Sequence, residues 1–125
     1  MMKKERVPCL NAGFWIIFPV STNIEELKKH LPPKTQYDIY EDEGHMLATI
    51  VEVKEIYGWE MDTVLTQLFS LCDLDRCKKV ADMYSGQIHI GMWFYSGDAS
   101  PAIILEGKNM EIIHRLNADL SLDAY

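Results

Sequence analysis

The chain has 125 residues, of which 48% are hydrophobic and 25% charged, and its formal net charge at pH 7 is −7. This size and composition are typical of one globular domain whose core is large enough to fold without metal or disulfide support. The negative charge argues against nucleic acid or an anionic membrane as a partner, because both repel an acidic surface. It favours a basic protein as the partner.

The three cysteines, at positions 9, 72 and 77, form no CxxC pair, and the four histidines have no metal-binding spacing. We expect buried free thiols, no metal, no cofactor and a reducing, cytoplasmic setting. A signal peptide is not expected, because the basic start Met1–Arg6 is not followed by a long apolar segment. No apolar run approaches the roughly 20 residues of a membrane-spanning helix.

The first part of the chain predicts a strand and a short helix. We expect one domain over residues 1–125, with residues 1–11 flexible. The continuous apolar run Gly13–Val20 predicts a buried strand. The helix after it has capping-box spacing between Thr22 and Glu25.

Two strands follow, Gln36–Tyr40 and Met46–Ile56, joined by a short acidic turn. Strict alternation in the second strand would place Val53 on the same face as Leu47 and opposite Met46. A hairpin is therefore expected here.

The middle of the chain predicts two helices. Trp59–Cys72 has apolar residues at helical spacing, with Leu68 at the centre of the stripe, and should pack on the sheet. Asp73 is a suitable N-cap for the second helix, Leu74–Tyr84. Gly86 stands where a helix-ending glycine is expected.

The stretch Gly86–Tyr95 predicts the central strand of the sheet. Its even positions, among them Ile90, form a purely apolar face that should lie under the helices. Gly91 leaves a gap in the other face, where a backbone or a ligand could approach closely.

The end of the chain predicts a short strand at Ala102–Leu105, a helix capped by Asn109, and a final strand at Asp119–Tyr125. The buried stripe of that helix is expected to be Met110, Ile113 and Leu116. The order of the elements indicates an α+β fold, with a mainly antiparallel sheet and helices packed on one face. A ferredoxin-like arrangement is the first expectation.

Two groups of side chains are candidate partner-binding residues. The segment Asp38–Glu43 carries four carboxylates in six residues, with tyrosines beside them. Such a patch could dock a basic surface, although a solvated turn would have the same composition. The second face of the central strand carries a histidine and aromatic residues with polar tips, which suits a partner site. The candidates are Tyr37, Asp38, Tyr40, Glu41, Asp42, Glu43, His89, Trp93 and Tyr95.

The second half of the chain resembles a family of small bacterial proteins catalogued only as a domain of unknown function. The resemblance covers residues 51–125. It rests on the strand Gly86–Phe94, on Ile103–Leu105, on the helix Met110–Leu116 and on the closing strand Leu120–Tyr125. Proteins of this kind resemble immunity proteins, which are encoded beside bacterial toxins. The resemblance implies no catalytic residue.

The resulting hypothesis is a cytoplasmic immunity protein, not an enzyme, that binds and neutralises a basic toxin domain such as a nuclease. One alternative is a small-molecule sensor or enzyme with a pocket around His89 and Trp93. Another is a homo-oligomeric structural or regulatory protein, such as a homodimer, that pairs through an exposed strand edge.

Overall fold

The computed structural model describes residues 9–57, 60–95 and 105–124. The strands are β1 (Cys9–Pro19), β2 (Gln36–Tyr40), β3 (His45–Tyr57), β4 (Gln87–Tyr95) and β5 (Asp119–Ala124). The helices are α1 (Ile24–Lys28), α2 (Met61–Ser70), α3 (Leu74–Met83) and α4 (Gly107–Arg115), and a 3-10 turn η1 (Glu41–Glu43) joins β2 to β3. The predicted strand at residues 102–105 falls mostly outside the described residues.

The five strands form one sheet in the order β2-β3-β1-β4-β5. β1 is antiparallel to β3 and to β4, β2 is antiparallel to β3, and β5 is parallel to β4. The first four strands and their helices follow the β-α-β-β-α-β connectivity of the ferredoxin-like motif. The helix α4 then carries the chain to β5, as a parallel neighbour requires. The predicted α+β class and the mainly antiparallel sheet are confirmed.

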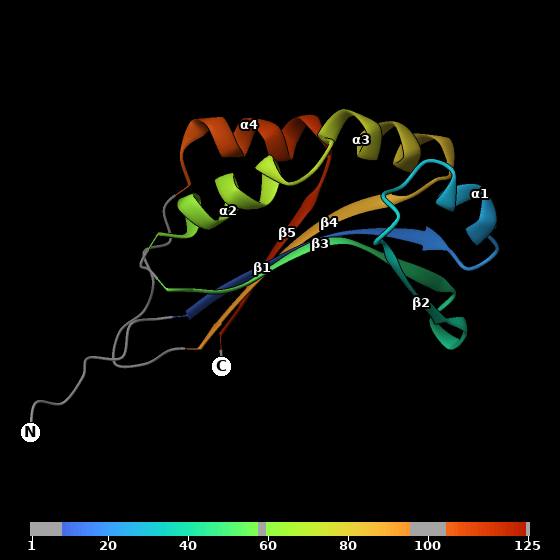
Figure 1. The fold of residues 1–125 in the computed structure, drawn as a ribbon, viewed down its shortest axis with the longest axis horizontal. Helices are drawn as coiled ribbons and strands as arrows, with labels where there is room; N and C mark the ends of the chain where they lie inside the picture. Colours follow the sequence, from blue (N-terminus) through green and yellow to red (C-terminus); the bar gives the residue numbers. More distant parts are fainter. Residues whose placement is uncertain (1–8, 58–59, 96–104, 125) are drawn as a thin grey trace, which may run out of the picture.

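The helices form a layer on one face of this sheet, with the short α1 at one end of the layer (Figure 1). Alternate residues of β1 and β4 point into the core between the layers, because side chains of a strand alternate between its faces. Phe14, Ile16 and Ile90 are among the fully buried ones. The predicted apolar face of β4 is therefore confirmed.

The strand order corrects two expectations. The middle strand is β1, and β4 lies beside it, since β5 adds a further edge. β1 also begins at Cys9, so residues 9–11, expected to be flexible, all pair with β4, and Cys9 and Leu10 also pair with β3. Asn11 is buried there, and its side-chain amide donates to the carbonyl of Trp93 at 3.4 Å.

A β-bulge corrects the prediction for β3. Phe14 pairs with Val51 and Trp15 with Thr49, so β3 has one extra residue between these pairs. The alternation inverts at that point, as an inserted residue requires. Val53 is therefore buried on the helix side, opposite Ala12, and does not share the face of Thr49.

Two helix ends also differ from expectation. Asn23, not Thr22, caps α1, and its side-chain oxygen accepts from the Glu25 N–H at 2.9 Å. After α3, whose predicted cap Asp73 is confirmed, the left-handed residue is Ser85, with φ 56°, and not Gly86. Gly86 is needed for space, since a Cβ there would lie 2.6 Å from the Phe18 ring.

The helix α4 is rotated relative to the predicted stripe. Asn109 is not its cap: it lies in the first turn, is 2% exposed, and faces α2. Met110, predicted to be buried, is 55% exposed, whereas Leu116 is buried as expected. A buried polar contact to α2 therefore sets the rotation of this helix.

Within the described ranges, no helix combines the length and the apolar character needed to cross a membrane.

Candidate functional site

The face of the sheet opposite the helices is left uncovered by the described part of the chain (Figure 1). We call this surface the open face. By strand register, its side chains include Gln36, Asp38, Tyr40, His45, Leu47, Thr49, Glu52, Trp15, Ile17, Gln87, His89, Trp93, Asp119, Ser121 and Asp123. Candidate residues from both predicted groups therefore share one surface.

An aromatic row lies at the middle of the open face. Trp15 stacks on His89, with ring centroids 5.9 Å apart and an interplanar angle of 27°, and on Trp93, at 6.0 Å and 20°. A Cβ at Gly13 would lie 2.4 Å from the Trp15 ring, and one at Gly91 would lie 2.2 Å from it. Because neither glycine has a side chain, the Trp15 indole lies flat against the sheet at these two positions.

His89 has one polar partner on this face. Its Nε2 lies 3.0 Å from the hydroxyl oxygen of Ser121 on β5. In enzymes that use a serine nucleophile, the serine and its histidine base lie at a similar distance. Among the described residues, however, no carboxylate is hydrogen-bonded to His89 to orient its ring, and the ring packs on Trp15. The contact accounts for the position of the ring without requiring a reaction.

Charge is distributed unevenly: on the helices and loops carboxylates and basic side chains occur together, whereas the open face carries mostly carboxylates. The open face carries the carboxylates of Asp38, Glu52, Asp119 and Asp123. Of the described lysines and arginines, only Lys54 lies on a strand, and its ammonium is 3.4 Å from Glu52. The other described basic side chains belong to the helices and loops. The open face is therefore acidic, and a basic partner would be attracted to it.

The acidic turn lies at one end of the open face. Glu41, Asp42 and Glu43 form η1, and all three are exposed. Tyr40 is 44% exposed and packs on His45, with ring centroids 5.3 Å apart.

Tyr37 does not belong to the open face. It pairs with Ala48 on the helix side and packs against the core, and burial raises the pKa of its phenol. The side chain of Tyr95 lies outside the described residues. Tyr37 therefore lies apart from the other described candidates, whereas Asp38, Tyr40, His89 and Trp93 lie on the open face and Glu41, Asp42 and Glu43 lie at its end.

Trp15 lies in the aromatic row of the open face, although the sequence did not single it out as a candidate. Gly13–Val20 is a continuous apolar run, which predicts burial on both faces. In the structure Phe14 and Ile16 are fully buried, whereas Trp15 is only partly covered. The alternation of glycine and tryptophan with fully apolar residues is the signal that could have placed Trp15 on the open face.

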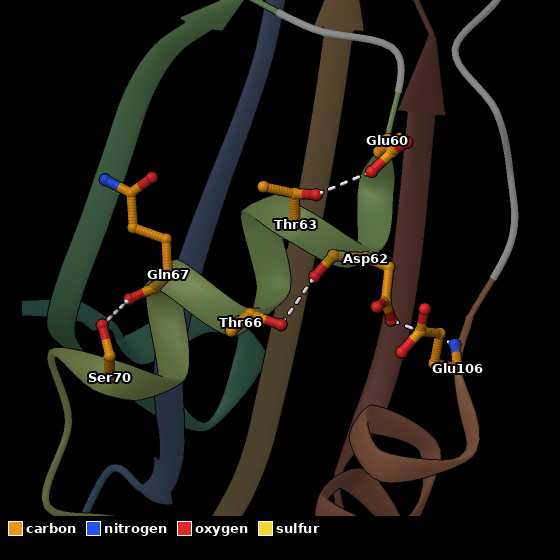
Figure 2. Close-up of a pocket in the computed structure, with 7 residues that line it drawn as sticks. All are labelled: Glu60, Asp62, Thr63, Thr66, Gln67, Ser70 and Glu106. Carbon is orange, nitrogen blue, oxygen red and sulfur yellow. Dashed lines mark hydrogen bonds between the residues drawn. The ribbon is translucent and has the colours of Figure 1, made fainter.

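A hollow of about 590 Å³ lies on the outer side of α2, away from the open face (Figure 2). Its hydroxyl groups already donate within the chain: Thr63 to Glu60, Thr66 to the carbonyl of Asp62, and Ser70 to the carbonyl of Gln67. It is lined by Glu60, Asp62, Thr63, Thr66, Gln67, Ser70 and Glu106. Among the described residues that line it, none is a histidine or a cysteine that could serve as base or nucleophile, so we assign it no reaction.

Beside that hollow, a hydrogen-bond cluster joins α2 to α4. The amide of Asn109 donates to the carboxylate of Asp62 at 2.8 Å and to the hydroxyl of Thr66 at 3.0 Å. Asp62 also accepts from the backbone N–H of Glu106 at 3.0 Å, at the start of α4. Asp62 of α2 therefore accepts a hydrogen bond from the backbone at the start of α4 and helps to fix the position of that helix.

Cys72 and Cys77 are not suited to nucleophilic chemistry. Burial raises the pKa of Cys72 to about 12 and that of Cys77 to about 11. The neutral thiol is a poor nucleophile and a poor metal ligand. In the ranges that the structure describes, no three His, Cys, Asp or Glu side chains are grouped to hold a metal ion.

Comparisons of this chain with protein-family models, with curated proteins and with solved structures found no match. The resemblance of residues 51–125 to the small bacterial family therefore stays a prediction.

Proposed function

We propose that this protein is a binding protein that neutralises a basic bacterial toxin domain, as immunity proteins do, by covering it with the open face. The observation that supports this most is the aromatic row of His89, Trp15 and Trp93, which lies on an uncovered sheet surface bordered by carboxylates. Tryptophan side chains are the commonest energetic anchors of protein interfaces, and a polar border around them excludes water. This surface supports a role in binding, and in the part of the chain that the structure describes the His89–Ser121 pair on it has no carboxylate to orient the histidine.

The charge of the open face supports a basic partner. A nuclease toxin carries a basic surface because it must bind phosphates. An acidic protein with basic residues on its far side would approach such a surface in one orientation, which speeds productive encounter. In this proposal the carboxylates guide the encounter, and the tryptophans hold the complex together.

The first test is co-expression with the domain encoded immediately upstream of this chain in its genome. We expect that domain alone to arrest growth, this chain to restore growth, and the two to elute as a stable complex. An upstream product without toxicity, or toxicity that this chain does not relieve, would overturn the proposal.

The second test asks whether the open face makes the contact. Trp93→Ser should abolish both protection and complex formation, whereas Trp93→Phe should keep most of both. Leu71→Ser is the matched control, because Leu71 is 58% exposed at the end of α2 on the helix side. Equal loss in the Trp93 and Leu71 serine variants, with both folded by circular dichroism, would place the interface elsewhere.

The enzyme alternative has its own test at the His89–Ser121 pair. The purified protein, His89→Gln and Ser121→Ala are screened for turnover of nucleotides, esters and phosphoesters. We expect no turnover in any of them, and full protection by His89→Gln unless the ring lies inside the interface. Turnover by the native protein that both variants lose, with the fold intact, would favour an enzyme.

A further inference from the structure

The outer edge of β5 and a groove beside it form a second feature of the molecule, distinct from the aromatic row. β5 is the last strand of the sheet, so in the described part of the chain its outer backbone groups pair with no other strand. An open strand edge can accept an extended segment, which adds to the sheet through main-chain hydrogen bonds.

A groove of about 310 Å³ lies between α4 and the start of β5 on the helix side, and its lining is mostly apolar, with His114 and Asn117 as its polar members. Leu120 forms its floor, and Met110 and Ile113 of α4 form its wall. Arg115, on the opposite side of α4, lies 3.8 Å from Asp75 of α3, so the wall with Met110 is turned away from α3 and towards the free edge. This position explains why Met110 is 55% exposed although it is a large apolar residue.

The two faces of β5 differ in chemistry. Leu120 and Leu122 pair with Ile90 and Met92, so they lie on the helix side next to the groove. Asp119 and Asp123 lie on the open face. A strand added along this edge would therefore meet apolar surface with one set of alternate side chains and carboxylates with the other set.

A second copy of this chain does not satisfy that pattern. If two β5 strands paired antiparallel about Ser121, Asp119 of each would stand opposite Asp123 of the other. Like charges placed directly opposite destabilise a strand pair. That register is therefore unfavourable for a second copy, whereas a strand that carries basic residues at these positions meets no such repulsion.

We propose that the β5 edge binds an extended segment of the protein partner in which apolar residues alternate with lysine or arginine. The apolar side chains enter the groove beside Met110, and the basic ones lie against Asp119 and Asp123. This inference rests on the proposed function for the basic character of the partner, but it concerns a separate surface and can be tested without the toxin.

The probe is a labelled six-residue peptide, as long as β5, that alternates valine with lysine or arginine, titrated against the full chain by fluorescence anisotropy. One control has the same composition with its valines and basic residues in two blocks, and another has glutamate in place of the basic residues. We expect the block peptide to bind roughly tenfold more weakly, which is about 1.4 kcal/mol, and the acidic peptide not to bind. Equal binding by the alternating and block peptides would reduce the effect to net charge and overturn the proposal.

Protein variants then locate the site. Met110→Lys should weaken binding of the alternating peptide strongly, and the Asp119→Asn, Asp123→Asn double variant should weaken it too. Met83→Lys is the matched control, since Met83 on α3 is 51% exposed and lies outside this groove. The peptide should also slow hydrogen exchange of β5 amides. Equal effects of the two lysine variants, or unchanged exchange in β5, would overturn the proposal.

The outcomes separate this inference from the proposed function. Trp93→Ser should leave peptide binding unchanged while it abolishes protection against the toxin. If the toxin complex forms but no peptide binds, the edge proposal alone fails. If the peptide binds at β5 but no toxin is neutralised, the edge proposal stands and the immunity function fails.

Discussion

The indole of Trp15 lies directly over Gly91: a Cβ built on that glycine would fall 2.2 Å from the ring atom Cζ3. The two residues belong to adjacent strands, β1 and β4, that are 76 positions apart in the chain, and Gly91 pairs with Gly13. Two facing glycines thus create the space in which one large side chain lies flat, and the aromatic row of the open face depends on that space.

Gly91→Ala should therefore be destabilising. The added methyl group must displace the Trp15 ring or the backbone, and overpacking of this kind costs about 1–3 kcal/mol. Urea unfolding measures the loss, and tryptophan fluorescence of the native state should change with it. Gly107→Ala is the control, because a Cβ there would meet nothing within 4 Å. Similar stabilities of the two variants would show that Trp15 moves without cost.

Asp62 and Asn109 should be energetically coupled. Each single change to alanine removes the hydrogen bond between the Asn109 amide and the Asp62 carboxylate, and because one partner is charged we expect a loss of about 1–3 kcal/mol in the free energy of unfolding. The double variant should cost clearly less than the sum of the two, because the shared hydrogen bond is lost only once. Asp82→Ala, which removes only a surface ion pair with Lys78, should change stability by less than about 1 kcal/mol. Additive losses at Asp62 and Asn109 would contradict the role of this contact.

Leu68→Ala tests the core under α2. Leu68 has no exposed surface, and α2 lies mainly over β1 and β3. Truncation should cost about 2–5 kcal/mol, from lost burial and the cavity left behind. Leu71→Ala, at a side chain that is 58% exposed, should cost less than about 0.5 kcal/mol. Chemical denaturation compares the two, and a loss below about 1 kcal/mol at Leu68 would mean that α2 packs through another side.

Neutralising the carboxylates of Asp38, Glu41, Asp42 and Glu43 together should slow association with a basic partner and flatten the salt dependence of its on-rate. These groups lie at one end of the open face, where they act on the approaching partner before contact. Stopped-flow or surface-based kinetics at several salt concentrations measures the effect.

The control for this experiment neutralises Glu25, Asp75, Asp82 and Glu111, which are exposed on the helices. Both sets change the formal charge of −7 by the same amount. If both sets slow binding equally, only net charge matters, and the acidic end of the open face has no special part in the encounter.

Cys72 and Cys77 should make the stability of the fold sensitive to alkaline pH. Below the ordinary thiol pKa of 9.0 both thiols are protonated in the folded and unfolded chain, and they contribute no pH dependence. Between pH 9.0 and the folded-state pKa values of about 11 for Cys77 and about 12 for Cys72, only the unfolded chain loses these protons. The free energy of unfolding should therefore fall as the pH rises through this window.

A Cys72→Ala, Cys77→Ala double variant should lose part of this alkaline decline, whatever its stability at neutral pH. The measurement is the slope of unfolding free energy against pH in the two proteins. Parallel slopes would show that the thiols are not responsible. Alkylation of Cys72 and Cys77 by iodoacetamide should likewise be slow until the protein unfolds.

Much of the fold could be predicted from local pattern. The stripe of α2, the Asp73 cap of α3 and the apolar face of β4 depend on residues close together in the chain, and their periodicity or hydrogen-bonding chemistry is strong enough to decide the element. The α+β class followed from the order of such elements, because each apolar face must be buried against another.

The sequence by itself determined most of the helices and strands, the net negative charge of the chain, and the position of His89 and Trp93 on one face of β4. Only the tertiary structure decided how those pieces combine. The β-bulge that turns Val53 inward depends on pairing with β1, and the rotation of α4 depends on the distant Asp62. The position of Trp15 depends on glycines that meet only when β1 and β4 lie side by side. Such contacts join positions far apart in the chain, and no local pattern records which of them will be neighbours.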